Sequence, residues 1–217
     1  MEVIDIMELK RLGVIGVGHL GQHHARVYTE ILGTQLVGVM DLSESRASLV
    51  GENLGIPYYS DLNNFIKNAR PEAVSVVVPT SHHYEVAKTA LENGIHVLIE
   101  KPVTTTVSEA EDLLRIAEQS ELVLQVGHIE RFNSAIQYIS KTVREPIFLE
   151  SRRLGPFSPR INDVGVVLDL MIHDIDIILS LVRSEITQIS AMGRCLRSNY
   201  EDIASAQMHF ANGAMAH

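Results

Sequence analysis

An aspartate and a histidine four residues apart have the chemistry to move a proton. In the stretch DLMIHDID at 169–176, Asp169 and His173 occupy positions i and i+4 of a predicted helix and so share one face. A carboxylate beside a histidine orients the ring and stabilises its protonated form, as a general base requires. A satisfied local contact is the alternative interpretation. A metal site that adds Asp174 and Asp176 is disfavoured, because adjacent side chains point apart and no second ligand group is evident.

A second candidate is Lys101, in the sequence IEKP at 99–102. It follows a predicted strand at 95–99, and ligands of open α/β sheets bind beyond the carboxyl ends of the strands. A cation at this position could stabilise a developing alkoxide or contact the ribose next to a nicotinamide. A surface Lys-Pro turn is the alternative interpretation.

The sequence GVGHLG at 16–21 matches the pattern G-x-G-x-x-G, and it follows a predicted strand and opens a predicted helix. Gly16 permits a tight turn, Gly18 lets a pyrophosphate approach the backbone, and Gly21 lets the helix pack closely on the sheet. The N–H groups at the helix start, where His19 and Leu20 lie, are suited to bind phosphates. A tight turn without a ligand is the alternative.

An acidic residue supports a dinucleotide at this turn. Asp41 closes the next predicted strand, 20 residues beyond Gly21, where a carboxylate accepts hydrogen bonds from an adenosine ribose. Such a carboxylate repels a 2′-phosphate, so NAD is favoured over NADP, although Arg46 is close enough in sequence to reach such a phosphate. Asp41 as a simple strand-end turn residue is the alternative.

Strands and helices alternate over the first part of the chain. The predicted strands are apolar throughout, which is typical of a parallel sheet covered on both faces. Strands are expected at 12–17, 35–40, 73–78, 95–99 and 122–126, and helices at 20–32, 43–54, 61–68, 81–93 and 107–120. We therefore predict an α/β Rossmann domain, with a doubly wound parallel sheet, over residues 1–126.

Residues 127–217 have a different pattern. Helices are expected at 130–143 and 165–181, and strands at 147–152, 186–192, 203–211 and 214–217. Asn212-Gly213 predicts a hairpin turn, and in the strand before it Met208 and Phe210 lie on one face. This pattern predicts an α+β domain with an antiparallel open sheet. Because the chain stops just after a turn inside that sheet, we expect the domain to be truncated.

The composition excludes several classes of protein. The chain has 217 residues with a net charge of −9 and no extended basic cluster, so a nucleic-acid partner is not expected. No apolar run approaches the ~18 residues of a membrane helix. The acidic start is a poor signal peptide, and Cys195, the single cysteine, cannot form an internal disulfide. We expect a cytoplasmic protein.

Taken in order, five segments of the sequence resemble the Gfo/Idh/MocA oxidoreductase family. They are GVGHLGQHHA at 16–25, VVVPTSHHYEVA at 76–87, GIHVLIEKP at 94–102, VGHIERFN at 126–133 and VVLDLMIHDID at 166–176. The resemblance implies that Lys101, Asp169 and His173 are catalytic. It places His24, His83 and the Arg131-Phe132 pair on family motifs. The residues expected to bind the cofactor are Gly16, Gly18, His19, Leu20, Gly21, Asp41, Arg46, Pro79, Thr80, His83, Glu100 and Lys101.

The resemblance also implies an activity. It predicts an NAD-dependent dehydrogenase acting on a sugar, nucleotide sugar or polyol, with copies associating through the C-terminal sheet. RLGPFSPR at 153–160 and the segment after it look most like the branch that oxidises the 3-hydroxyl of UDP-N-acetylglucosamine. A sharp turn with a cis Lys101–Pro102 peptide bond is expected as well. The alternatives are a regulator that binds sugar or NAD without turnover, an inactive fragment, or a base at His128 or His83.

Overall fold

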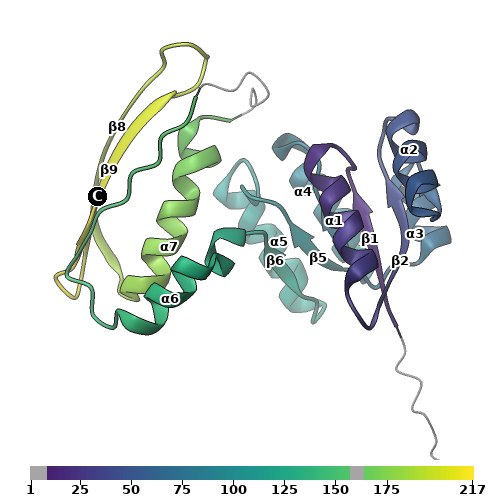
Figure 1. Ribbon diagram of the computed structural model, residues 1–217, viewed down its shortest axis with the longest axis horizontal. Coiled ribbons are helices and arrows are strands. Elements are labelled where there is room, and N and C mark those ends of the chain that lie inside the picture. Colours follow the sequence, from purple (N-terminus) through teal and green to yellow (C-terminus); the bar gives the residue numbers. More distant parts are fainter. Residues whose placement is uncertain (1–8, 157–163) are drawn as a thin grey trace, which may run out of the picture. The chain divides into compact units, whose positions relative to one another are not determined.

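The computed structural model describes residues 9–156 and 164–217, and the chain divides after Gly127 into two compact units. The first unit contains a six-stranded sheet and the second a four-stranded sheet (Figure 1). The acidic start at 1–8, and residues 157–160 of the RLGPFSPR stretch, lie outside the described residues. No helix in the described parts of the chain is both long and apolar enough to cross a membrane.

The first unit alternates strands with helices, as predicted, and it contains one further short strand, β3 (Tyr58–Tyr59), that was not predicted. Its elements are β1 (Lys10–Ile15), α1 (His19–Glu30), β2 (Thr34–Met40), α2 (Glu44–Leu54), β3 (Tyr58–Tyr59), α3 (Leu62–Ala69), β4 (Ala73–Val76), the 3-10 helix η1 (Thr80–His82), α4 (His83–Glu92), β5 (His96–Ile99), α5 (Val107–Gln119) and β6 (Leu124–Val126).

All six strands of this unit run parallel, in the order β3-β2-β1-β4-β5-β6. The chain builds outward from β1 to β3, and then returns to add β4 to β6 on the other side of β1. The strand order therefore reverses between β1 and β4, which is the point at which such sheets bind ligands. This arrangement confirms the predicted doubly wound sheet.

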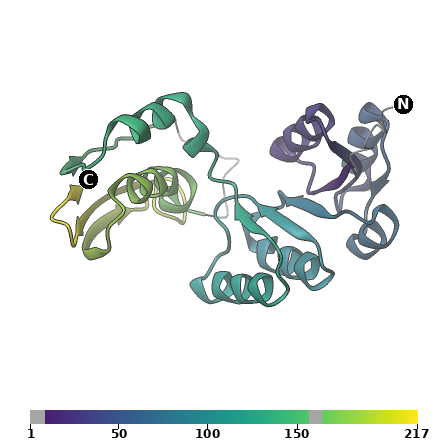
Figure 2. The ribbon, with the colours of Figure 1, turned by 90° about the horizontal axis from the view of Figure 1, so that it is seen from below.

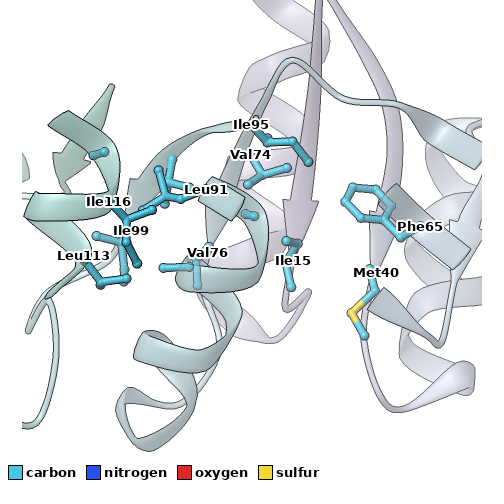
Figure 3. Packing of buried hydrophobic residues seen from close by; sticks show 14 residues of the cluster. Ile15, Met40, Phe65, Val74, Val76, Leu91, Ile95, Ile99, Leu113 and Ile116 are labelled. Atoms are coloured by element: carbon cyan, nitrogen blue, oxygen red, sulfur yellow. The ribbon is translucent and has the colours of Figure 1, made fainter. Parts of the chain in front are cut away.

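Each face of this sheet has its own hydrophobic core, because successive side chains of a strand point to opposite faces. Val14 and Val39 point to the face covered by α1 and α2. Ile15 and Met40 point to the opposite face, where they join a cluster with Phe65 of α3 and residues of α4 and α5 (Figure 3). Figure 2 shows helices on both sides of the strands, which explains why the strands are mostly apolar.

The second unit combines helices with a small sheet. Its elements are the 3-10 helix η2 (Ile129–Phe132), α6 (Ser134–Thr142), β7 (Phe148–Leu149), the π-helix η3 (Val167–Met171), α7 (Ile172–Val182), β8 (Ile186–Arg194), β9 (Ile203–Phe210) and β10 (Met215–Ala216). Met208 and Phe210 of β9 pack with Ile178 and Val182 of α7, which confirms that they share one face of that strand.

The sheet of the second unit is mixed, in the order β7-β10-β9-β8. The pairs β8–β9 and β9–β10 are antiparallel, and Asn212-Gly213 forms the predicted turn before β10. The pair β10–β7 is parallel, which corrects the prediction of an antiparallel sheet at this edge. The chain between β7 and the hairpin passes through α7, and a connection that contains a helix permits a parallel pair.

In the second unit, two predicted helices are interrupted, and the first predicted strand is much shorter than expected. The helix expected at 130–143 is η2 followed by α6, because the Asn133 side chain accepts a hydrogen bond from the Ala135 N–H (3.0 Å) and begins a new helix there. The helix expected at 165–181 starts as the π-helix η3 and continues as α7. Of the strand expected at 147–152, only Phe148–Leu149 forms a β-strand, although the Ser151 N–H also donates to the His217 carbonyl oxygen (2.9 Å).

Candidate functional site

The glycine-rich turn joins β1 to α1 at the switch point of the sheet. Gly16 has a φ of +89°, and a Cβ there would lie 2.6 Å from the Val77 carbonyl oxygen. A Cβ at Gly21 would lie 1.8 Å from the Gly16 carbonyl oxygen. These two positions therefore exclude any side chain, and they allow the tight turn and the close helix packing that the motif predicts.

The start of α1 has the properties of an anion site. Gly18 is its N-cap residue and provides no side-chain cap, and the first turn holds no acidic residue. A Cβ added at Gly18 would meet no atom within 4 Å, so space is open beside this backbone. His19 packs edge-on against His23 (centroids 5.4 Å apart), and Leu20 is 40% exposed. The N–H groups of the first turn are thus available to a phosphate.

Asp41 connects the end of β2 to the glycine-rich turn. Its carboxylate is buried, and Oδ2 accepts a hydrogen bond from the Val17 N–H (3.0 Å). Oδ1 accepts from the Ser43 N–H (2.9 Å) and from Nη2 of Arg46 (3.0 Å). From the sequence, Asp41 favours NAD, whereas Arg46 could bind the 2′-phosphate of NADP. In the structure the two side chains form one ion pair.

The loop after β4 carries three further predicted cofactor ligands. Pro79 precedes η1, and Thr80 is buried within it. His83 is 1% exposed, and its ring nitrogens lie 2.8 Å from the Pro102 carbonyl oxygen and 2.9 Å from that of Val78. Both nitrogens of His83 are therefore engaged by main-chain atoms rather than directed at a ligand or a substrate proton.

The segment after β5 contains the E-K-P motif. The Lys101–Pro102 peptide bond is cis, as predicted. Lys101 is half-buried, and it follows the carboxyl end of β5 directly after Glu100. Glu100 is 6% exposed, and its Oε2 accepts a hydrogen bond from the main-chain N–H of Lys101 (3.3 Å). Glu100, predicted as a cofactor ligand, thus bonds to its own neighbour.

A buried polar network that the sequence analysis missed lies beside this motif. Nε2 of His24 lies 3.1 Å from Oε1 of Glu100, and Nδ1 lies 3.0 Å from Oγ of Ser75. The hydroxyl of Tyr28 lies 2.6 Å from the same Ser75 oxygen, and burial raises the pKa of this tyrosine. The sequence feature that could have indicated this network was Ser75, a polar residue within an otherwise apolar strand.

In the second unit, Asp169 and His173 lie in one continuous helical segment. Asp169 belongs to η3 and His173 to the first turn of α7, and both side chains are half-buried. The four-residue spacing therefore crosses from a π-helical to an α-helical turn, whereas the sequence pattern predicts an α-helix throughout. A π-turn within a helix is frequent at functional sites.

The start of this helical segment is held by Glu201, which lies between β8 and β9. Its Oε1 accepts a hydrogen bond from the Val167 N–H (3.3 Å), and its carbonyl oxygen accepts one from the Val166 N–H (2.8 Å). A hollow of about 580 Å³ adjoins Asp169 here and is lined also by Gly165 and Ser198. Glu201 thereby satisfies N–H groups that a helix start leaves without partners.

The two other acids of the DLMIHDID stretch are paired with arginines. Asp176 accepts from Nε of Arg131 (2.7 Å), which raises the pKa of that guanidinium, and Nε2 of His128 lies 3.8 Å away. Asp174 accepts from Nε of Arg153 (3.1 Å) and from the Ser151 hydroxyl (2.8 Å). No cluster that could hold a metal is found within the described residues.

Comparison with known proteins gives matches over both units. Residues 10–128 match the family described as "Oxidoreductase family, NAD-binding Rossmann fold", and residues 145–217 match "GFO/IDH/MocA C-terminal domain". The chain is 42% identical to UDP-N-acetylglucosamine 3-dehydrogenase of Acidithiobacillus ferrooxidans and 31% identical to scyllo-inositol 2-dehydrogenase (NAD(+)) of Bacillus subtilis. It is covered to 95% and 94% in these comparisons, and it spans 65% of the length of each relative.

Solved structures agree with these matches. A structure of the Acidithiobacillus ferrooxidans enzyme superposes with a TM-score of 0.89, over 95% of this chain and 67% of that one. The scyllo-inositol dehydrogenase of Lactobacillus casei, solved with NAD(H) and scyllo-inositol bound, superposes with a TM-score of 0.85 at 24% identity. That alignment covers 96% of this chain and 68% of the other, and it supports the fold alone.

Proposed function

Because this chain belongs to the Gfo/Idh/MocA family of oxidoreductases, we propose that the protein is a dehydrogenase that uses NAD to oxidise a hydroxyl of a sugar-type substrate. The substrate that we propose is UDP-N-acetylglucosamine, oxidised at its 3-hydroxyl, because the relative named for that activity is 42% identical. The chain spans 65% of that relative's length, so the proposal concerns the activity of the full-length protein.

The observation that carries the proposal is the geometry around the glycine-rich turn of the first unit, which consists of Gly16–Gly21, the start of α1 and Asp41. A helix start without a side-chain cap, an open flank at Gly18 and a buried carboxylate at the end of β2 fit a pyrophosphate followed by a ribose. Asp41 would hold the adenosine ribose through the second lone pair of Oδ2, since Val17 uses only one. The same carboxylate disfavours a 2′-phosphate, which supports NAD over NADP.

NAD supplies the hydride acceptor when it is bound. In the mechanism that we propose, His173 accepts the proton of the substrate hydroxyl on a ring nitrogen, while the hydrogen on the carbon leaves as hydride. Asp169 orients the His173 ring and balances its positive charge. The ammonium of Lys101 stabilises the negative charge that develops on the substrate oxygen. Removal of the proton by a positioned base contributes about 10²–10⁴ in rate.

The proposal extends to location and assembly. A single cysteine, Cys195, is compatible with the reducing cytoplasm, where we place the protein. We also propose that copies associate through the sheet of the second unit. β8 is an edge strand whose residues are exposed along its whole length, and an unpaired edge is a template for pairing with another chain.

The test is the formation of NADH by the full-length protein, followed by absorbance, with UDP-N-acetylglucosamine, free N-acetylglucosamine and inositols as substrates. We expect turnover with the nucleotide sugar and NAD, and much less with NADP. Turnover with an inositol but not with the nucleotide sugar would support the proposed dehydrogenase activity and contradict the proposed substrate. Binding of NAD without NADH formation from any of these compounds would favour a regulator that does not turn over its ligands.

A further inference from the structure

The two residues that flank Lys101 each contact a histidine, Glu100 through its side chain and Pro102 through its carbonyl oxygen. On the N-terminal side, the Glu100 carboxylate lies 3.1 Å from His24 through Oε1 and accepts the Lys101 N–H through Oε2. On the C-terminal side, the Pro102 carbonyl oxygen lies 2.8 Å from Nδ1 of His83. Glu100 therefore takes part in two of these contacts, and Lys101 and Pro102 in one each.

The Glu100 carboxylate is enclosed within the first unit. A Cβ at Gly127 would lie 2.7 Å from Oε1, so the backbone of Gly127 approaches this oxygen closely. The polar chain behind it has a consistent donor order, in which Tyr28 donates to Ser75, Ser75 to Nδ1 of His24, and Nε2–H of His24 to Glu100. A buried polar network that is satisfied in this way is rigid.

The His83 ring forms a second, independent connection. It spans from the Val78 carbonyl oxygen, in the loop after β4, to the Pro102 carbonyl oxygen, in the loop after β5. With 1% of its surface exposed, the ring has no freedom to leave this position without repacking α4, which it begins. Because both neighbours are carbonyl oxygens, the neutral ring donates a hydrogen bond to one of them and packs against the other. The ring thus lies wedged between the two loops that follow neighbouring strands, next to Lys101.

We propose that Glu100, His24 and His83 are positioning residues for Lys101 rather than ligands of the cofactor. They fix the backbone from which the lysine reaches the substrate oxygen. This inference depends on the charge-stabilising role of Lys101 in the proposed function. It assigns Glu100 and His83, which the sequence analysis placed among the cofactor ligands, to the support of a neighbouring group. A displacement of about 1 Å at a reacting group can cost about 10²-fold in rate.

The experiment compares Glu100→Ala, His24→Ala and His83→Ala in the full-length protein by steady-state kinetics and by calorimetry with NAD. We expect kcat to fall about tenfold or more, with NAD affinity changed by less than about threefold. Matched controls are Glu72→Ala and His96→Ala, which remove side chains that accept the main-chain N–H groups of Arg11 (2.9 Å) and Val123 (3.0 Å) at the opposite end of the sheet. The controls should leave both quantities unchanged.

A double-mutant cycle with Lys101→Met separates positioning from a general structural role. In that background, Glu100→Ala and His83→Ala should change the residual rate by less than about twofold, because the group they position is gone. Equal losses in both backgrounds, or a loss of NAD affinity that matches the loss of rate, would overturn the inference. A full rate in Lys101→Met alone would refute the proposed role of Lys101, and this inference with it.

A conservative variant covers the case in which Glu100→Ala does not fold. Glu100→Gln keeps an oxygen facing His24 but turns its amide toward the Lys101 N–H, and so releases that one bond. Hydrogen exchange measured by mass spectrometry should then be faster in the peptide that contains Lys101, and unchanged in the glycine-rich turn. Unchanged exchange together with an unchanged rate in Glu100→Gln would contradict the proposal.

Discussion

Replacing Asp41 with asparagine should destabilise the glycine-rich turn. The carboxylate accepts the Val17 N–H at Oδ2, and the Ser43 N–H and Arg46 at Oδ1. Asparagine has one carbonyl oxygen, so its amide group must face either Val17 or Ser43, donor against donor. Because Asp41 is 6% exposed, water cannot readily replace the lost acceptor. We expect the free energy of unfolding to fall by about 1–3 kcal/mol.

The same substitution should change nucleotide choice. The adenosine ribose of NAD loses an anionic acceptor, which we expect to cost about 1–2 kcal/mol, or about 5- to 30-fold in affinity. A 2′-phosphate no longer meets a carboxylate. Arg46, whose side chain is 57% exposed, is released from Asp41 to donate to that phosphate. The preference for NAD over NADP should therefore fall by at least about tenfold.

Calorimetry with NAD and NADP tests this prediction on the wild type, Asp41→Asn, Arg46→Ala and the double variant, with unfolding in urea followed in parallel. Arg46→Ala should weaken NADP binding in the Asp41→Asn background and have little effect on NAD in the wild type. A folded Asp41→Asn protein with unchanged selectivity would refute the role given to the carboxylate.

Three further predictions concern the second unit. His173→Ala should lower kcat by about 10²-fold or more at constant NAD affinity, and Asp169→Asn should lower it as well; near-normal turnover would place the base elsewhere. Glu201→Ala should lower the free energy of unfolding by about 1 kcal/mol, and Glu201→Gln by less, because the Val167 N–H loses its acceptor; equal stability in urea would contradict this. Main-chain N–H groups lower the pKa of Asp202 from 3.8 to about 2, so its contribution to stability is complete above 3.8 and is lost as the pH falls through about 2. In Asp202→Asn, the loss of stability between pH 3.8 and about 2 should be smaller than in the wild type. An acid-unfolding curve identical to that of the wild type would contradict this prediction.

Features carried by local patterns were predictable from the sequence. The strand, glycine turn and helix at Leu12–Leu32 form one continuous segment, and Asp41 follows at the spacing that a ribose contact requires. Alternation in β9 and the Asn212-Gly213 turn likewise depend on neighbours in the chain. Each of these patterns indicates a backbone conformation, or the side of a strand that is buried, and a few adjacent residues determine either one.

Features that depend on distant partners were not predictable in the same way. His24 contacts Glu100, which is 76 residues away, and Arg131 contacts Asp176, which is 45 residues away. Nothing near either residue in the sequence specifies these pairings. The parallel β7–β10 pair depends on the path by which α7 returns the chain to the sheet. The π-turn of η3 cannot be predicted from a pattern based on α-helical spacing.

The most direct test of the proposed function uses UDP-N-acetylglucosamine carrying deuterium on carbon 3. The full-length protein is incubated with this substrate and NAD, and the reduced nucleotide is analysed by mass spectrometry. Transfer of hydride from that carbon predicts NADH that carries the deuterium, formed at a much lower rate by His173→Ala. NADH without deuterium, or no NADH at all while NAD remains bound, would contradict the proposed reaction.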